Sequence, residues 1–308
     1  MEGQDEAIIG ICGGVGPAAG LLLHQNILNH TENHGVDQGH LDVVHISRSR
    51  DTVDRTKYLL GHETEENPAD GMARTLNMVC DSATSRNGSR MVVGVPCNTF
   101  HAAPIWNEFV SLTAGHNIEL VHMLDETVRL IQRTVPHCKK VGLLSTTGTR
   151  TSRVYHDLLE PAGFEVVQVP GELQAQVHDT IYNPAWGIKA TAPAVSPRAI
   201  SNFRAFATQL AQEGAQTIIL GCTEIPYAFH GVDRVENAIL IDPMVALARG
   251  LIRQTAKYKL KPMTVKRLGP MFRKPVLKIP PKPLRRSPSS QDSWFGFYTD
   301  FVDKILAV

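Results

Sequence analysis

The alternation of short apolar runs with longer amphipathic segments constrains the fold of this chain most strongly. Most of the runs lack the polar residue at every second position that a strand with one wet face would show. They therefore favour parallel strands that are buried on both faces. The predicted strands are residues 7–12, 41–46, 91–95, 118–122, 141–144, 164–169, 217–220 and 238–241.

The segments between these runs have the apolar spacing of helices. In residues 68–83, for example, Met72, Leu76 and Val79 fall on one face. Strands that alternate with helices predict an α/β fold with parallel sheets, whose ligands bind beyond the carboxyl ends of the strands. The predicted helices are residues 68–83, 123–134, 149–160, 197–213 and 243–257.

The chain has 308 residues, which at about 150 residues per domain favours two domains. We predict two similar parallel-sheet α/β domains that face each other across a cleft, followed by an extra C-terminal tail. The first domain would comprise residues 1–118 and 239–258, and the second residues 119–238.

The tail, residues 259–308, differs in composition from the rest. It contains seven prolines and a net charge of +8, whereas the first 258 residues carry −7. Residues 278–290 predict an extended linker. Aromatic residues then recur at helical spacing in residues 293–308, which predicts an amphipathic helix. We expect this helix to dock on the same chain or on a partner subunit, and the alternative is a helix on a membrane surface.

Charge and cysteine usage exclude several classes of protein. The total net charge of +1 gives no indication of a nucleic-acid partner. The first six residues are acidic and the first basic residue is Arg48, so the sequence predicts no targeting peptide and a cytoplasmic protein. Five widely spaced cysteines form neither a disulfide framework nor a zinc-binding pair. We predict no metal site.

The strongest functional signal is a pair of similar segments 125 residues apart. In each, a buried strand leads into a cysteine, first Cys97-Asn98-Thr99 and then Cys222-Thr223-Glu224. Backbone N–H groups at the junction of a strand with a helix favour a thiolate or a carboxylate. The repeated context predicts that the two cysteines face each other.

Two facing cysteines suit the inversion of an amino acid at its α-carbon. One group must remove the α-proton from one face while another delivers a proton to the opposite face. A thiol can do either, because its ordinary pKa of about 8.5 is close to neutral. Asn98, Thr99 and Thr223 are placed to help bind the α-carboxylate.

Two other interpretations compete. The turn Gly14-x-Gly16-x-x-Ala19, with Asp37 or Asp42 further on, matches the fingerprint of a nicotinamide-dependent dehydrogenase, but it leaves the paired cysteines unexplained. Cys97 and His101 have the spacing of half a metal site or of a thiol hydrolase pair. We expect His101 instead to support the cysteine loop.

Three motifs together, GGVGPAAG at 13–20, PCNTFH at 96–101 and GCTEIP at 221–226, resemble the pyridoxal-independent aspartate/glutamate racemase family. The resemblance covers about residues 7–258. It implies two similar α/β domains, no cofactor, a homodimer, and Cys97 and Cys222 as the catalytic bases. The same motifs place Gly14 and Glu224 in the substrate site.

Further matches to the family concern the substrate. Asp54-Arg55-Thr56 resembles the segment whose arginine holds the distal carboxylate. Residues 181–189 resemble the segment that carries a substrate-facing lysine, which would be Lys189. Residues 145–149, including Thr147, resemble an anion-binding loop of the second domain. Two departures, Gly20 in place of a threonine and the proline-free loop 47–53, leave aspartate and glutamate open.

The sequence therefore predicts a cofactor-independent racemase of an acidic amino acid. The alternatives are a related isomerase or decarboxylase of a small dicarboxylate, and a non-catalytic protein that binds an acidic amino acid.

Overall fold

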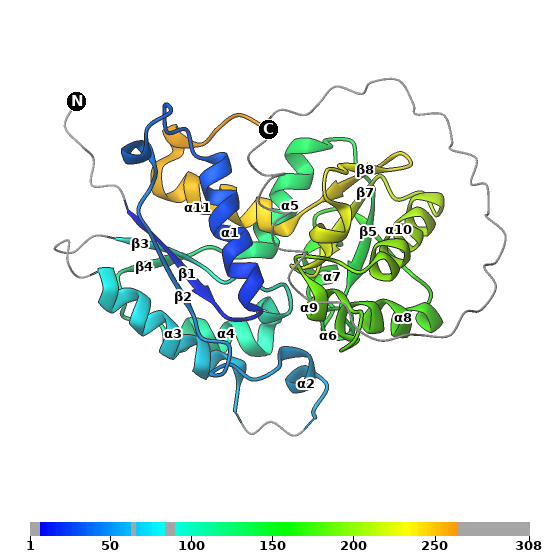
Figure 1. Ribbon diagram of the computed structural model, residues 1–308, viewed down its shortest axis with the longest axis horizontal. Helices are drawn as coiled ribbons and strands as arrows, with labels where there is room; N and C mark the ends of the chain where they lie inside the picture. Colours follow the sequence, from blue (N-terminus) through cyan, green and yellow to red (C-terminus); the bar gives the residue numbers. More distant parts are fainter. Residues whose placement is uncertain (1–6, 63–65, 84–89, 264–308) are drawn as a thin grey trace, which may run out of the picture. The chain divides into compact units, whose positions relative to one another are not determined.

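The computed structural model describes residues 7–62, 66–83 and 90–263 (Figure 1). All of these residues fall within one compact unit. The predicted linker at 278–290 and the predicted terminal helix at 293–308 lie outside the described residues.

The first sheet contains four parallel strands in the order β2-β1-β3-β4. Ile9 on β1 lies opposite Val43 on β2 and Val92 on β3, which sets the register. The strands are β1 Ile8–Gly13, β2 Val43–Ser47, β3 Met91–Gly94 and β4 Ile118–Leu120.

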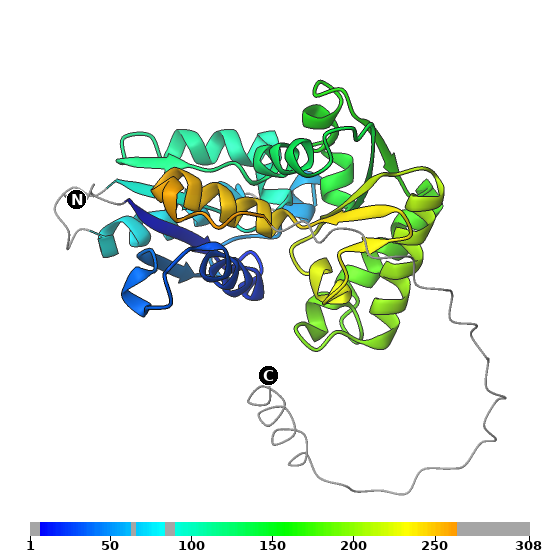
Figure 2. The same ribbon diagram turned by 90° about the horizontal axis from the view of Figure 1, so that it is seen from above.

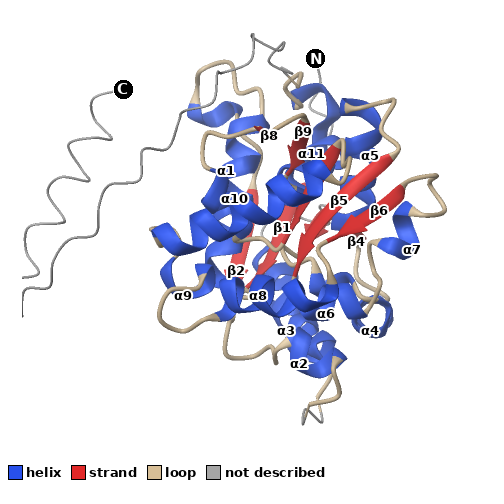
Figure 3. Cartoon of the chain, turned by 90° about the vertical axis from the view of Figure 1, so that its right-hand side faces the viewer, coloured by secondary structure: helices blue, strands red, loops and turns tan. Residues whose placement is uncertain are grey.

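The second sheet has the order β6-β5-β7-β9-β8, and all its pairings are parallel except that of β8 with β9. Figure 3 shows the strands as red arrows. The two parallel sheets confirm the predicted α/β fold. The strands are β5 Lys140–Ser145, β6 Glu165–Gln168, β7 Thr217–Gly221, β8 Arg234–Val235 and β9 Ala238–Ile241.

Helices cover both faces of each sheet, which explains the continuous apolar character of the strands. On β1, Ile9 and Ile11 join the core beneath α1 and α11, whereas Ile8 and Cys12 join the core beneath α3 and α4. The longer helices are α1 Pro17–His30, α3 Pro68–Ala83, α4 Ala103–Leu112, α5 Met123–Thr134, α8 Gly171–Tyr182, α10 Pro197–Gln212 and α11 Pro243–Ala256. The short helices are α2 Arg55–Leu59, α6 Thr147–Thr151, α7 His156–Leu159 and α9 Ile188–Thr191. No helix in these described ranges is long and apolar enough to cross a membrane.

The helix predicted at 149–160 is wrong as a single element. Arg153 has a φ of 53°, in the left-handed region, so the chain leaves the helix there. The segment forms α6 and α7 instead. The predicted domain boundaries stay predictions, but strand pairing places β4 in the first sheet and β9 in the second.

Two helices carry the chain between the sheets. α5 follows β4 of the first sheet and leads into β5 of the second, and α11 follows β9 and packs against α1 and α5. Figure 2 shows α11 beside the helices of the first half. Gly250 permits this packing, because a Cβ there would lie 2.7 Å from Glu126 Cγ on α5.

Replacing Asp242 by asparagine should change how the stability depends on pH. Asp242 accepts a hydrogen bond from the Met244 N–H at 2.8 Å and caps α11. Burial raises the pKa of Asp242 from 3.8 to about 6, against the backbone N–H groups that lower it. The folded state therefore binds the proton of the Asp242 carboxyl more tightly than the unfolded state does. The stabilisation from this protonation is fully present below pH 3.8 and is lost as the pH rises through about 6.

Asparagine keeps the capping oxygen but does not titrate. The free energy of unfolding of Asp242→Asn should exceed that of the wild type by about 3 kcal/mol at pH 7.5 and match it near pH 3.5. Urea titrations of both proteins at the two pH values test this. An equal difference at both pH values would contradict it.

Candidate active site

Cys97 and Cys222 both lie at the carboxyl edge of a sheet. Cys97 comes three residues after β3, and Cys222 directly follows β7. Both side chains are buried, at 6% and 5% exposure. A short 3-10 helix follows each cysteine, η2 Thr99–His101 and η3 Ile225–Phe229, so the two segments have the same local fold.

Arg55, at the start of α2, is the cationic partner of Cys97. Burial lowers the pKa of Arg55, but nearby groups outweigh it and the pKa is raised. The largest of these contributions comes from Cys97, followed by Asp54 and Tyr182. One guanidinium nitrogen, Nη1, donates to the Val53 carbonyl at 3.3 Å. Its Nε is buried without a hydrogen-bond partner among the described residues. A buried donor of this kind requires an acceptor, and a carboxylate of a bound molecule could supply it.

Glu224 connects Cys222 to Lys189. The Cys222 thiol donates to Glu224 Oε2 at 3.0 Å, and Lys189 Nζ donates to Oε1 at 2.7 Å. The Thr223 hydroxyl also donates to Oε2, at 2.9 Å. Burial, and next the charge of Glu224, raise the pKa of Cys222, so this sulfur is held as a thiol. Burial lowers the pKa of Lys189, but Glu224 outweighs it, so the pKa is raised.

Tyr182, at the end of α8, lies between these two groups. Its hydroxyl is 3.4 Å from Thr56 Oγ1, next to Arg55, and Lys189 Nζ lies 5.6 Å from its ring centre. Burial raises the pKa of Tyr182 to about 12; Lys189 opposes this, and Asp54 and Cys222 add to it. Arg55, Tyr182, Lys189 and Glu224 therefore connect Cys97 to Cys222 in one polar network. The sequence analysis did not assign Tyr182 a role.

The loop after β5 supports the segment that carries Cys97. Thr99 Oγ1 is 2.8 Å from Thr149 Oγ1, and the Tyr155 hydroxyl donates to Asn98 Oδ1 at 2.5 Å. The amide nitrogen of Asn98 is buried without a hydrogen-bond partner among the described residues, so a second donor near Cys97 is available. The predicted site residue Thr147 begins α6, and its N–H donates to His178 Nδ1 at 3.4 Å.

His101 uses both ring nitrogens within the protein. Nε2 accepts from the Met123 N–H at 3.2 Å, so Nδ1 carries the proton and donates to the Cys97 carbonyl at 2.8 Å. Burial, followed by the neighbouring His122, lowers the pKa of His101, which keeps the ring neutral. These contacts fix the ring against the segment that carries Cys97, and the supporting role stays a prediction. The two contacts leave no free ring nitrogen for a metal or for a hydrolase pair. Among the described residues, no group of three His, Cys, Asp or Glu side chains could hold a metal ion.

The glycine turn after β1 lies against protein groups. Gly14 has a φ of 103°, and a Cβ there would lie 2.8 Å from the Arg48 backbone. A Cβ on Gly16 would lie 2.9 Å from Glu224 Oε1. Gly20 faces His45, whose ring a Cβ would overlap, and this explains why a glycine stands at this position.

The dehydrogenase interpretation is wrong. Asp37 and Asp42 both precede β2, which runs parallel to β1, so they lie at the amino edge of the first sheet. The glycine turn lies at the opposite, carboxyl edge. A dinucleotide would need both at the carboxyl edge.

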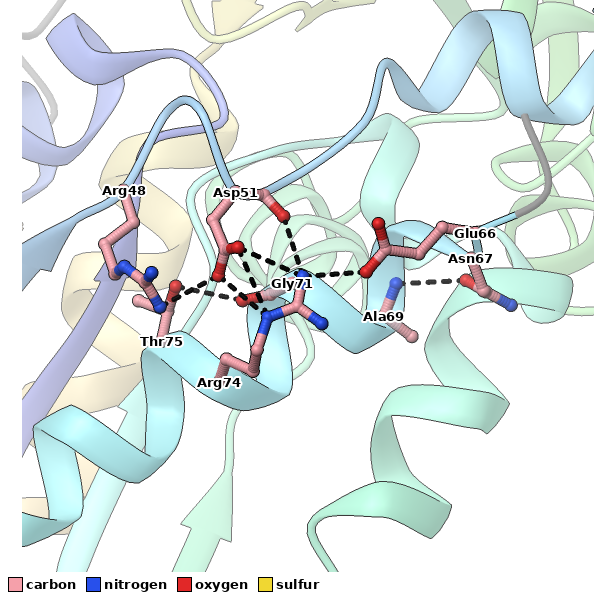
Figure 4. Close-up of polar contacts among 8 residues, drawn as sticks. All are labelled: Arg48, Asp51, Glu66, Asn67, Ala69, Gly71, Arg74 and Thr75. Carbon is pink, nitrogen blue, oxygen red and sulfur yellow. Dashed lines mark hydrogen bonds and ion pairs between the residues drawn. The ribbon is translucent and has the colours of Figure 1, made fainter. Parts of the chain in front are cut away.

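Charged residues anchor the loop that leads to Arg55. Arg74 on α3 binds Asp51 through Nε and Nη2 at 3.0–3.2 Å and Glu66 at 2.7 Å, and Arg48 binds Asp51 at 2.8 Å (Figure 4). Gly71 allows the Asp51 carbonyl to lie directly against α3. These contacts hold the proline-free loop in place.

Comparison with known proteins gives a consistent result. Residues 12–251 match the family model described as Asp/Glu/hydantoin racemase. An uncharacterised protein of Pectobacterium carotovorum is 32% identical over 131 residues, which cover 39% of this chain and 81% of that protein.

Two solved structures are similar in fold. The aspartate racemase of Picrophilus torridus matches with a TM-score of 0.65 and 23% identity, over 81% of this chain and 94% of that one. The glutamate racemase of Francisella tularensis, in complex with D-glutamate, matches with a TM-score of 0.55 and 17% identity, over 85% of each chain.

Proposed function

Because the chain belongs to the Asp/Glu/hydantoin racemase family, we propose that it interconverts the L and D forms of an acidic amino acid, aspartate or glutamate, without a cofactor. The observation that carries this proposal is the polar network that connects the two cysteines, since two-base inversion needs two proton-transferring groups at one site.

In the proposed mechanism the two thiols exchange roles with the direction of reaction. In the structure Cys222 is a thiol that donates its hydrogen bond to Glu224, and in this state it acts as the acid. Cys97, beside Arg55 at the other end of the network, is the base in this direction. Cys97 removes the α-proton, and Cys222 delivers its own proton to the opposite face. In the opposite direction the two cysteines exchange these roles.

The proposed substrate contacts follow the unpaired donors and the charges. Arg55 Nε and the Asn98 amide would receive carboxylate oxygens, because each is a buried donor without a partner. Lys189 adds a positive charge that Glu224 balances. The hydroxyls of Thr99 and Thr223 already have protein partners, so we assign them to hold the two cysteine loops. The homodimer and the cytoplasmic location stay predictions.

Incubation of the purified protein with each amino acid in deuterated water tests the proposal. We expect deuterium at the α-carbon and inversion of aspartate or glutamate. Binding of an acidic amino acid without exchange would support the non-catalytic alternative. Loss of carbon dioxide from a dicarboxylate would support the decarboxylase. Exchange in neither aspartate nor glutamate would refute the proposal.

Removal of the Arg74 side chain should weaken substrate binding from a distance. Arg74 is 47% exposed, so its ion pairs contribute at most about 1 kcal/mol to stability. Arg74→Ala should therefore leave the melting temperature nearly unchanged. The freed loop would displace Arg55, so KM for the acidic substrate should rise more than kcat falls.

Arg204→Ala, at an exposed position on α10, is the matched control and should behave as the wild type. Arg74→Lys should restore the charge but not the two-pronged contact with Asp51 and should recover KM only in part. An unchanged KM in Arg74→Ala would show that the network does not position Arg55.

A further inference from the structure

A pocket with four arginines lies between α5 and α11. It encloses about 210 Å³. Arg129, Arg133 and Arg253 come from the C-terminal halves of the two helices, and Arg249 lies at the middle of α11. Because both helices begin at the carboxyl edges of the sheets, the pocket lies toward the end opposite to Cys97 and Cys222. The lining residues include Glu126, Arg129, Arg133, Arg249, Arg253 and Met263.

Glu126, the single carboxylate of the pocket lining, already accepts hydrogen bonds from two of the arginines. Arg253 Nη2 donates to both oxygens of Glu126 at 2.6 Å, and Arg129 Nη1 donates to Oε1 at 2.5 Å. Glu126 is only 3% exposed, which places it beneath the pocket rather than at its mouth. The lining therefore retains a net charge of about +3.

Arg249 shows the effect of this excess charge. Its hydrogen-bond partners are neutral, the His30 ring at 3.3 Å and the Lys261 carbonyl at 3.1 Å. Burial, and then the like charges of Arg133 and Arg253, lower the pKa of Arg249. Repulsion among guanidinium groups that share one pocket is a cost that a bound anion would remove.

We propose that this pocket binds a small phosphate-bearing anion with two or more negative charges, such as a diphosphate group. Guanidinium groups bind phosphate oxygens through paired N–H donors. Tetrahedral phosphate offers oxygens in several directions, which suits donors that approach from two helices. The volume admits a group of this size but not a nucleic acid.

The position of the pocket couples it to the site. α5 and α11 are the two helices that connect the halves, and Gly250 brings them into close contact at Glu126. An anion held by both helices fixes their relative position and thereby the relation between the Cys97 and Cys222 loops. This coupling rests on the proposed function, whereas the binding itself does not.

Calorimetric titration of the full chain with pyrophosphate tests the binding. We expect saturable binding of one pyrophosphate per chain. Arg133→Glu should weaken it at least tenfold, and because Arg133 is exposed this variant should fold normally. Arg204→Glu, which reverses an exposed charge on α10, is the control and should bind within twofold of the wild type. Succinate, which carries two carboxylates, should bind more weakly than pyrophosphate.

No saturable binding by the wild type, or equal losses in Arg133→Glu and Arg204→Glu, would overturn the proposal. Tighter binding of succinate than of pyrophosphate would show that the pocket prefers a dicarboxylate, and this would also refute the proposal. Racemisation measured with and without pyrophosphate tests the coupling. Pyrophosphate binding by a protein without racemase activity would refute the proposed function and leave the anion site standing.

Discussion

Cys97→Ser and Cys222→Ser should each lose racemisation by about 10²- to 10⁴-fold, the range that a positioned acid or base contributes. The serine hydroxyl is isosteric with the thiol but is a far weaker acid and base at neutral pH. Measurement of the optical rotation of aspartate and glutamate with time, from both enantiomers, gives the two rates directly.

The two variants should differ in the exchange of the α-proton. Each retains one thiol, so each should still exchange deuterium into one enantiomer only, and the two variants should prefer opposite enantiomers. Cys80→Ser is the matched control, because Cys80 is a half-buried cysteine on α3 outside the network. Full racemisation by both single variants would eliminate the two-base mechanism.

Arg55→Ala should reduce kcat/KM selectively for acidic substrates. Removal of one partner of a buried, charge-assisted hydrogen bond costs about 2–5 kcal/mol. That corresponds to a loss of roughly 30- to 5,000-fold. Arg55→Lys keeps the positive charge but offers no Nε–H, so it should recover only part of the activity.

A neutral amino acid separates the two functions proposed for Arg55. If Arg55 binds the side-chain carboxylate, the residual activity on alanine should change much less than that on aspartate. Because Arg55 also lies beside Cys97, equal losses on both substrates would assign it to the base instead. Equal native activity on alanine and aspartate would contradict the acidic substrate class.

The strands could be predicted from sequence because both of their faces are buried. A run such as residues 217–220 has no charged residue and only one polar residue, Thr217, and the structure places it at the centre of the second sheet. Helix α8 carries a weaker signal, since Val177 and Ile181 are its only buried aliphatic residues. The break at Arg153 depends on one backbone angle that the side-chain pattern does not encode.

The same distinction holds for the site. The repeated strand-to-cysteine context identifies Cys97 and Cys222 as candidates without knowledge of the fold. Tyr182 could not be found in this way, because its contact with Thr56 joins residues 126 positions apart and depends on how α8 packs. The contact of Arg74 with Asp51 is equally non-local, and surface arginines are too common for their sequence position to reveal it.

The path of the chain through α11 sets the order in which the protein can fold as it is synthesised. Every strand of the second sheet lies between residues 140 and 241, so that half is complete once its last strand has left the ribosome. The first sheet is made earlier, but the apolar face formed by Ile9, Ile11 and Leu23 is covered by Leu247 and Leu251 of α11. The hydrophobic core of the N-terminal half therefore stays incomplete until nearly 260 residues have been translated. A chaperone that shields apolar surfaces on nascent chains should bind this half for longer than the half that follows it.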